Sequence, residues 1–572
     1  MTTVMMAVEK RNKFLLLSLW YLAGALWFLS YGYTEMAGSD LWWHLASGRE
    51  IIEQGTLWLR DDWSFSANGE RWRNHEWLAD LIYWGWYRLF GLQALVYWKW
   101  LILVASYSGL QLLLYRLTRN HPASLLLAVV AMAVGAPFLD VRPHLYSLLC
   151  TVIMLHLVVS RAGFWSFALL FLVWVNLHGG FIYGLLTLPL LLFPYRHFSW
   201  LALRQVAWLY LGCVAVCLLN PDGVKVVLMP LVYALQADSP FRQIAEWLPI
   251  WRPGGIRAPL FYGSISLLPL SLAGYLLLAR YRCGSVPWPW LLLVLFTLAM
   301  ALTSRRFIPL FALTLAVFCA PLAAYGLRWL NGRTRWNVLL GGVLLLVGLL
   351  RLAPYPIAAA PAFHYLTAQY SYPEYMVDVI QANNLKGNVF AYYNWGGYLH
   401  WRTDGALRVF IDGRANTLYS DQTYLDYVNV LARRPHWQEV LANSGARYLL
   451  WPRHRAGGMI RANILEQSGK WRMLLQTETA IFMERNDGLP VIHMQLPTAN
   501  VLAIQLELAA RALAMGVYPM AVQKAQAVLD VQPWQYRACH IRFRALLQMK
   551  AESDAREAQA ACQRQFPSDY LR

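Results

Sequence analysis

Long apolar runs, separated by short polar segments, make up most of the first 353 residues of the chain. A helix needs about 20 apolar residues to cross a bilayer, and eleven of these runs approach or reach that length. They are residues 14–32, 93–115, 122–138, 144–160, 164–178, 180–195, 201–219, 261–279, 287–303, 307–325 and 337–353. The pattern predicts a polytopic α-helical membrane protein with about 11 spans.

The composition agrees with this class. Of 572 residues, 58% are hydrophobic and 14% charged, whereas soluble domains carry roughly 25% charge. The net charge of +18 does not indicate a nucleic-acid partner, because excess Arg and Lys in membrane proteins gathers in cytoplasmic loops and at lipid headgroups. The chain has seven cysteines and no CxxC motif, so no zinc site is indicated.

The loops between the predicted spans alternate in charge. One set of loops contains basic residues and no acid. Its arginines are Arg116, Arg119, Arg161, Arg196, Arg204, Arg280, Arg282, Arg328, Arg333 and Arg335. The positive-inside rule places these loops, and the N-terminus, in the cytoplasm.

The other set of loops carries every acid between Tyr33 and Ala353. These acids are Glu35, Asp40, Glu50, Glu53, Asp61, Asp62, Glu70, Glu76, Asp80, Asp140, Asp222, Asp238 and Glu246. An odd number of spans puts the tail after Ala353 on the same, outer side. We therefore expect the chemistry to face away from the cytoplasm, where an enzyme needs a donor that is already activated, such as a lipid-linked one.

Basic residues also occur on the predicted outer side, against the general trend. They are Arg142, Arg305 and Arg306, with His44, His75, His144 and His178. Charges at the ends of spans are costly and tend to be functional, and a guanidinium suits a phosphate. The alternative for any single arginine is snorkelling to the headgroups.

The first outer loop, residues 33–92, predicts two helices. The string SDLWWHLASGREIIEQG begins one that Ser39 or Asp40 caps and Gly55 ends, lying in the membrane interface. A turn at Asn68-Gly69 precedes a second helix from Asn74. Trp42, Trp43, Trp72 and Trp77 suit either sugar stacking or an interfacial belt. For Asp40 the alternatives are a plain N-cap and a catalytic carboxylate, with Glu76 as a neighbouring acid.

Beyond residue 353 the chain becomes more polar. After a linker at 354–374, short strands and helices predict an α/β domain over 375–487, in which Asp412 and Arg414 either face a groove or belong to an Asp-Gly turn. Residues 498–572 are predicted to be helical. Leu513 and Leu547, Ala521 and Ala555, and Pro533 and Pro567 are each 34 apart, the period of tetratricopeptide repeats. In an oxidising compartment, Cys539 and Cys562 are placed to form a disulfide.

Several strings together resemble a known family. They are SDLWWHLASGREI, NHEWLAD, WVNLHGGFIYGL, NPDGV, EWLP and SRRFIP. With a first span, a long outer loop that opens with an acid, many further spans and an outer C-terminal domain, the chain resembles the GT-C superfamily of polyprenyl-phosphate-dependent glycosyltransferases. The resemblance covers about residues 14–353 and is to a bacterial branch, related in plan to protein O-mannosyltransferases and aminoarabinose transferases.

The resemblance implies an inverting transfer of a sugar from a polyprenyl phosphate such as undecaprenyl phosphate. Asp40 matches the catalytic base, and the adjacent pair of acids usual in the family is absent, which leaves Asp61, Glu76 and Asp140 as candidate second acids. The substrate-binding residues that it implies are His44, His75, Arg142, His144, His178, Glu246, Arg305 and Arg306. A divalent metal, Mg²⁺ or Mn²⁺, would suit a lipid phosphate, but no ligand spacing supports one.

The resemblance also implies a location and partners: a bacterial inner membrane, a periplasmic C-terminal domain, and a protein, lipid or glycan acceptor. A further protein could bind the helical repeats. Alternatives are an oligosaccharide polymerase or ligase, a lipid-sugar transporter or flippase, and a scaffold. Two motifs have simpler interpretations as well: NLHGG, with Asn176 and His178, as a hairpin between spans, and NPDG, with Asn220 and Asp222, as a turn.

Overall fold

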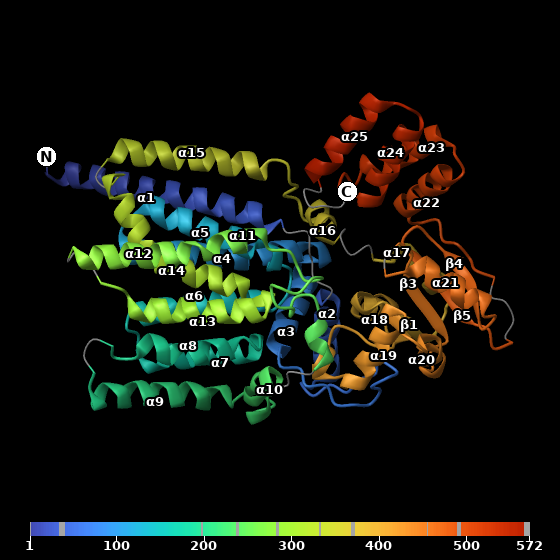
Figure 1. Ribbon diagram of the computed structural model, residues 1–572, viewed down its shortest axis with the longest axis horizontal. Helices are drawn as coiled ribbons and strands as arrows, with labels where there is room; N and C mark the ends of the chain where they lie inside the picture. Colours follow the sequence, from blue (N-terminus) through green and yellow to red (C-terminus); the bar gives the residue numbers. More distant parts are fainter. Residues whose placement is uncertain are drawn as a thin grey trace. The chain divides into compact units, whose positions relative to one another are not determined.

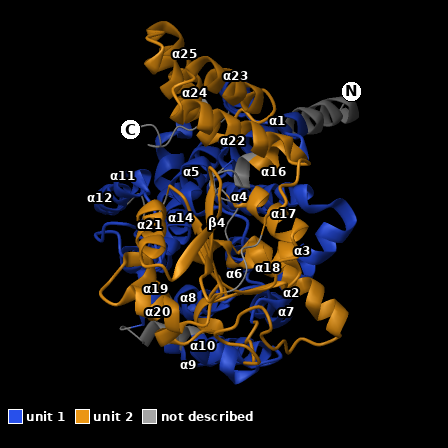
Figure 2. Cartoon of the chain, turned by 90° about the vertical axis from the view of Figure 1, so that its right-hand side faces the viewer, with its two compact units in different colours: residues 1–34, 75–359 blue, residues 35–74, 360–572 orange. Residues whose placement is uncertain are grey.

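The computed structural model describes residues 2–33, 40–195, 198–235, 239–281, 285–330, 333–367, 372–454, 456–488 and 493–565. Glu35, Ser39, Arg196, Asp238, Arg282 and Pro567, named above, lie outside the described residues. The chain forms two compact units, which Figure 2 shows in different colours. Unit 1 contains residues 1–34 and 75–359, and unit 2 contains residues 35–74 and 360–572.

Unit 1 is helical throughout its described part (Figure 1). Its α-helices are α1 (Thr2–Gly32), α3 (Trp77–Phe90), α4 (Leu95–Thr118), α5 (His121–Gly135), α6 (His144–Val159), α7 (Phe164–Leu177), α8 (Phe181–Leu192), α9 (Trp200–Cys217), α10 (Val224–Leu235), α11 (Pro259–Ile265), α12 (Leu267–Arg280), α13 (Trp288–Thr303), α14 (Ile308–Gly326) and α15 (Thr334–Leu352). Short 3₁₀ turns join several of them.

Seven stretches of unit 1 are long and apolar enough to cross a membrane, counted over the described residues. They are 14–32, 92–118, 121–138, 200–217, 259–280, 305–326 and 334–352. The apolar helices α6, α7, α8 and α13 are shorter. The protein is therefore a membrane protein, and the span count of about 11 stays a prediction.

Helix α14 lies at the centre of unit 1, because an unbroken run of its residues from Ile308 to Ala320 is buried. It packs against α5 and α13. Helices α1 and α15, far apart in the sequence, lie side by side. The Trp27 indole N–H donates to the Leu344 carbonyl at 3.0 Å, and the Arg351 guanidinium lies over the Tyr31 ring at 4.0 Å.

Unit 2 contains a five-stranded mixed sheet in the order β2-β1-β3-β5-β4. Its strands are β1 (Gly387–Ala391), β2 (Leu407–Val409), β3 (Tyr448–Pro452), β4 (Trp471–Gln476) and β5 (Ala480–Arg485). The β1 strand is parallel to both β2 and β3, and β5 is antiparallel to β3 and β4. The helices of unit 2 before its tail are α2 (Leu41–Gln54), α16 (Ala359–Thr367), α17 (Glu374–Ala382), α18 (Gly396–Thr403), α19 (Asp421–Ala432), α20 (Trp437–Asn443) and α21 (Gly458–Gln467).

Most of the first outer loop folds with the C-terminal domain, although the sequence assigned all of 33–92 to the membrane domain. Residues 63–65 extend the sheet beside β2, since the Val409 N–H donates to the Trp63 carbonyl at 2.9 Å and the Phe65 N–H donates to the Val409 carbonyl at 3.1 Å. Ser64 forms a parallel bridge with Val409. Backbone pairing thus joins the loop to a strand more than 340 residues later.

Helix α2 has the predicted limits, and Gly55 ends it in the left-handed conformation, with φ of 64°. It packs against α18 with Leu41, Leu45 and Ile51 buried, while Ile52 is exposed. Its place in a membrane interface stays a prediction. Trp42 makes edge contacts with Tyr398 and Tyr372. Trp42, Trp43 and Trp72 are all buried, so their faces meet protein and not sugar. The predicted turn at Asn68-Gly69 is present, with φ of 82° at Gly69.

Within the predicted α/β domain, the stretch GNVFAYYNWGGYLHW has the apolar pattern of a short strand, but it is a strand only over β1 and becomes helical from Gly396. The aromatic and apolar residues of α18 are buried on consecutive positions from Gly396 to His400. Burial on every side removes the 3.6-residue period that marks a helix, and a short apolar run then reads equally well as a buried strand.

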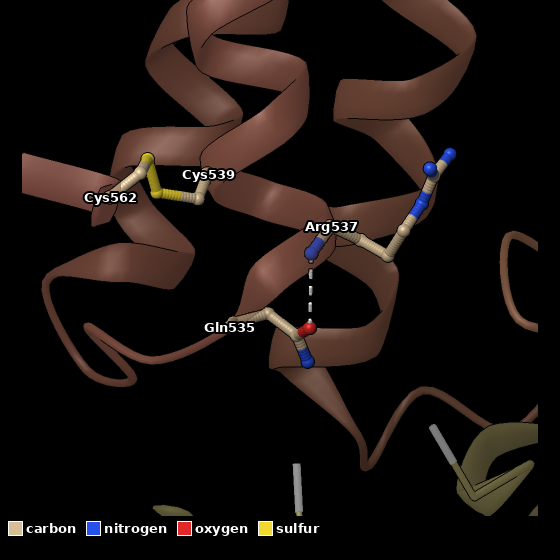
Figure 3. Close-up of a disulfide and its surroundings, with 4 residues drawn as sticks. All are labelled: Gln535, Arg537, Cys539 and Cys562. Atoms are coloured by element: carbon tan, nitrogen blue, oxygen red, sulfur yellow. Dashed lines mark hydrogen bonds between the residues drawn. A yellow bond between two sulfur atoms is a disulfide. The ribbon is translucent and has the colours of Figure 1, made fainter. Parts of the chain in front are cut away.

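The tail forms the four helices α22 (Val501–Ala514), α23 (Tyr518–Leu529), α24 (Tyr536–Gln548) and α25 (Glu552–Gln565). Ala521 and Ala555, which the 34-residue spacing relates, are both buried. A disulfide joins Cys539 of α24 to Cys562 of α25, with the Cα atoms 6.0 Å apart (Figure 3). The predicted pairing is confirmed, and the identity of the helices as tetratricopeptide repeats stays a prediction.

Candidate active site

Unit 1 contains a cluster that we call the Glu76 cluster, formed by His75, Glu76 and His178. Glu76 stands at the N-cap position of α3, but its side chain makes no capping hydrogen bond. Its Oε1 atom lies 3.6 Å from Nε2 of His75 and 3.6 Å from Nε2 of His178. The carboxylate is buried. Two predicted substrate-binding histidines therefore flank one predicted catalytic acid.

The hydrogen bonds of His178 define its tautomer. The Gly180 N–H donates to Nδ1 at 2.9 Å, so this nitrogen is an acceptor and carries no proton. Ser147 Oγ lies 2.7 Å from the same atom and receives the Trp174 indole N–H at 2.8 Å. The hydroxyl proton of Ser147 is thus directed at Nδ1. The remaining proton of the neutral ring sits on Nε2, which faces Glu76.

Three sequence motifs meet beside this cluster. The Trp77 indole N–H donates to Oδ1 of Asn176 at 2.9 Å, and Nδ2 of Asn220 donates to the same oxygen at 3.0 Å. Asn220 also receives the Asp222 N–H on its side-chain oxygen, which closes the predicted NPDG turn. NLHGG is the predicted hairpin between α7 and α8. Both motifs therefore form turns and also fix the end of α7 that carries His178.

A second group in unit 1, which we call the Glu246 cluster, contains Asp140, Arg142, Glu246 and Arg306. Arg142 Nε lies 2.9 Å from Asp140 Oδ2, and its Nη1 donates to Glu246 Oε2 at 2.6 Å. Arg306 Nη1 lies 3.7 Å from Glu246 Oε1. The Arg306 guanidinium stacks over the Trp247 ring at 4.2 Å. One carboxylate thus holds two guanidiniums that come from distant loops.

The protonation of Glu246 follows from its neighbours. Burial by itself would raise the pKa of this carboxyl, but Arg142 and Arg306 favour its charged form and lower the pKa to about 2. Glu246 therefore keeps its negative charge across the physiological range. Its charge holds the two arginines in place instead of serving as a proton acceptor.

His144 and a lysine adjoin the Glu246 cluster. Nε2 of His144 lies 2.6 Å from the Phe138 carbonyl oxygen and 3.5 Å from Asp140 Oδ1. Lys99, in α4, is fully buried, and Asp140 acts on it electrostatically. Sequence reasoning missed Lys99. The sequence does show Lys99 as a single cation between two tryptophans in the apolar run 93–115. A charge inside a membrane span is costly and tends to be functional.

The adjacent residues Arg305 and Arg306 have different surroundings. The Arg305 side chain donates to four carbonyls of one loop, those of Pro249, Ile250, Arg252 and Ile256. Arg306 makes a loose ion pair and a cation–π contact, and within the described residues its guanidinium makes no hydrogen bond. Arg305 therefore orders the loop, and Arg306 is the better placed of the two to meet a ligand.

Asp40 and His44 belong to unit 2. Asp40 occupies the N-cap position of α2, yet its side chain makes no capping hydrogen bond, so the simple N-cap interpretation does not account for it. Burial raises the pKa of the Tyr393 hydroxyl well above its ordinary value. Among the neighbouring charged groups, Asp40 raises this pKa the most. His44 is buried and packs its ring against Trp43 at 3.6 Å.

Asp61, a candidate second acid, also lies in unit 2, where it pairs with Arg414. The remaining predicted site residues lie in unit 1, in or beside the two clusters described. Tyr83 of α3 is buried and feels the charge of acids from both clusters. Burial raises its pKa, and the nearby acids Glu76, Asp80 and Asp140 raise it further. Among the described residues, no three His, Cys, Asp or Glu side chains converge as a metal centre requires. We therefore assign no residue as a metal ligand, and a divalent cofactor stays a prediction.

No protein-family model and no curated protein matches the sequence. Among solved structures, the fold is similar to the archaeal oligosaccharyltransferase AglB from Archaeoglobus fulgidus in complex with an inhibitory peptide and a dolichol-phosphate. The TM-score is 0.52 and the identity 13%, over 84% of this chain and 75% of that one.

A second structure of the Archaeoglobus fulgidus oligosaccharyltransferase is also similar. It is tethered through a disulfide bond to an acceptor peptide that contains the sequon NVT, and it matches with a TM-score of 0.50 and 12% identity over 81% of this chain and 72% of that one. Identities this low show the fold alone. The chain therefore shares the overall fold of these oligosaccharyltransferase structures.

Proposed function

We propose that this protein is a membrane glycosyltransferase that transfers a sugar from a polyprenyl-phosphate-linked donor to an acceptor. The observation that carries the proposal is the Glu246 cluster. Arg142 and Arg306 each lie two residues before an apolar helix, α6 and α14 respectively, and one carboxylate holds both. Helix N-termini and guanidiniums both favour anions. A lipid phosphate at the ends of membrane helices is the anion that fits this setting.

In the proposed reaction, Asp40 takes the proton from the acceptor group that attacks the anomeric carbon of the sugar. A bond forms between the acceptor atom and that carbon. The bond from the carbon to the phosphate oxygen breaks, and its electron pair leaves with the phosphate. Arg306 and Arg142 stabilise the charge that grows on the departing phosphate. A single displacement of this kind inverts the anomeric centre.

Of the two candidate second acids in unit 1, Glu76 suits the proposed reaction better. Asp140 is already the counter-ion of Arg142 at 2.9 Å. Glu76 lies between two imidazoles, and the His178 ring offers it an Nε2 proton. We propose that this group orients the donor sugar through its hydroxyls, with His75 and His178 as the contacting side chains.

We propose that unit 2 lies outside the cytoplasm, in a bacterial inner membrane protein whose N-terminus is cytoplasmic. The Cys539–Cys562 disulfide supports this side, because disulfides persist in oxidising compartments. The confinement of acids to one set of loops supports it as well. With seven cysteines in the chain and one disulfide, denatured, unreduced protein should present five free thiols. A count of seven would contradict the disulfide and this support for the location.

For the acceptor, a peptide is favoured by one finding, since the two similar oligosaccharyltransferase structures contain an inhibitory peptide and an acceptor peptide. Glycan and lipid acceptors are the other classes to be assayed. A further protein bound to the helices α22–α25 is proposed from their 34-residue spacing.

The test is transfer by the purified full chain, reconstituted in vesicles with radiolabelled polyprenyl-phosphate sugars and candidate acceptors. We expect Asp40→Asn to lower the rate by about 10²–10⁴-fold, the usual contribution of a positioned base, while the protein stays folded. The exposed Asp530→Asn in the tail is the matched control. Near-normal transfer by Asp40→Asn would exclude Asp40 as the base. Movement of labelled lipid across the vesicle without a covalent product would identify a transporter.

A further inference from the structure

Asp40 and Trp43 of α2 lie against a turn of the C-terminal domain at Gly413. A methyl group on Gly413 would lie 2.7 Å from Oδ1 of Asp40 and 2.8 Å from Nε1 of Trp43. From α18, a methyl group on Gly397 would lie 3.1 Å from the backbone nitrogen and Cβ of Trp43. No side chain larger than that of glycine fits at Gly413 unless the carboxylate moves.

The turn that contains Gly413 is held by a buried triad, formed by Asp61, Asp412 and Arg414. Arg414 Nε lies 3.0 and 3.1 Å from the two carboxylate oxygens of Asp412, and its Nη2 lies 2.8 Å from Oδ2 of Asp412. The same Nη2 atom lies 2.6 Å from Oδ1 of Asp61, a residue of the first outer loop. The side chains of all three residues are at most 1% exposed.

Aromatic rings enclose the Arg414 guanidinium. It lies 4.1 Å from the centre of the Trp63 ring, and the Tyr419 hydroxyl is 3.1 Å from its Nη2. Gly396 allows this close packing, because a methyl group there would lie 2.5 Å from Cβ of Asp412. The turn is therefore held by side chains of the first outer loop, by Tyr419 and by close packing against Gly396 of α18.

Stability alone is a weak reason for such a triad. Two carboxylates share one guanidinium away from water, so the group keeps a net negative charge that is expensive to bury. Apolar residues of similar volume often stabilise a core as well or better. Buried ionic groups define geometry, because their hydrogen bonds are satisfied in one arrangement only. Here that arrangement places a glycine against the carboxylate of Asp40.

We propose that the Asp412–Gly413–Arg414 turn is a positioning element for the Asp40 carboxylate, with Gly413 and Arg414 as positioning residues. This inference rests on the proposed function, in which Asp40 is the base. The C-terminal domain then takes part in catalysis indirectly, because its turn sets the position of the carboxylate that removes the acceptor's proton. The Asp40 side chain does not cap α2, and the turn at Gly413 lies against its carboxylate.

The experiment adds one methyl group at each of three glycines of the full chain. Gly413→Ala directs the methyl at Asp40, Gly397→Ala directs it at Trp43, and Gly85→Ala in α3 adds it where no atom lies within 4 Å. Displacement of a reacting group by about 1 Å can cost about 100-fold in rate. We expect Gly413→Ala to lower kcat by about that factor with KM for the polyprenyl-phosphate sugar unchanged, Gly397→Ala to have a smaller effect, and Gly85→Ala to have none.

A second measurement separates positioning from general damage. In the Asp40→Asn background, Gly413→Ala should cause no further loss in single-turnover transfer, because residues that act through one group are not additive. Equal losses in both backgrounds would overturn the inference, as would a normal kcat for Gly413→Ala. If Gly413→Ala does not fold, Gly397→Ala decides by the same comparison. If Asp40→Asn is inactive but the glycine variants have normal activity, this inference is wrong and the proposed function stands. If Asp40→Asn is active, the role of Asp40 as the base is wrong.

Discussion

Each unit of this protein contains an arginine that pairs with a carboxylate, and the two arginines are held very differently. Arg414 of unit 2 is 1% exposed, pairs with Asp61 and Asp412 at 2.6–2.8 Å, and is enclosed by rings. Arg306 of unit 1 is 26% exposed and meets Glu246 only at 3.7 Å. The first is closed to any ligand, and the second keeps donors that a ligand can use.

The charge of a side chain alone therefore does not identify a binding residue. The same contrast holds between neighbours in the sequence, since Arg305 donates to the carbonyls of one loop whereas Arg306 lies over Trp247. A guanidinium whose hydrogen bonds are all made within the protein stabilises the fold and has no donors left for a ligand. A guanidinium held by one carboxylate and one ring is positioned but still available.

The largest expected effect is on the closed arginine. Arg414→Ala leaves two buried carboxylates without their cation, which costs about 3–5 kcal/mol in the free energy of unfolding. Denaturation of the purified full chain, followed by tryptophan fluorescence, measures this loss. Arg556→Ala, which removes an exposed pair with Glu552, is the control and should change stability little. A normal unfolding curve for Arg414→Ala would contradict the assignment of the triad as a fixed element.

The next effect is on the open arginine. Arg306→Gln removes a charged donor from the proposed phosphate site, and such bonds contribute about 1.5–3 kcal/mol, so binding of polyprenyl phosphate should weaken by roughly 10–100-fold. The melting temperature should stay near that of the unchanged protein. Arg305→Gln is the matched variant, and it should lower the melting temperature by releasing the 249–256 loop. If the two variants exchange these results, the contrast between the arginines is wrong.

The smallest effect concerns pH. The folded protein holds the pKa of Glu246 at about 2, below its ordinary value, so its stabilising charge is fully present above that ordinary value and is lost as the pH falls toward 2. The difference in melting temperature between the unchanged protein and Glu246→Gln should therefore be constant from neutral pH down to about 5 and shrink in stronger acid. A difference that already shrinks between pH 7 and 5 would show that the two arginines do not hold this carboxylate.

Much of the local structure could be predicted from the sequence. The apolar runs form helices, Gly55 ends α2, and Asn68-Gly69 forms a turn, all as predicted. The cysteine pair forms the predicted disulfide. These features depend on residues close in the sequence or on a regular period. The stretch from Gly396 was the exception, because burial on all sides of α18 hid its helical period.

The candidate residues of the site were also visible in the sequence as charged or aromatic groups at the ends of apolar runs, but their partners were not. The sequence by itself determined a membrane protein with acids and arginines in separate loops, since hydrophobicity and charge are read residue by residue. Only the tertiary structure decided that the first outer loop joins the C-terminal domain, that Arg305 and Arg306 have different partners, and that Gly413 meets Asp40. Those outcomes depend on distances between residues hundreds of positions apart, and no local pattern encodes them.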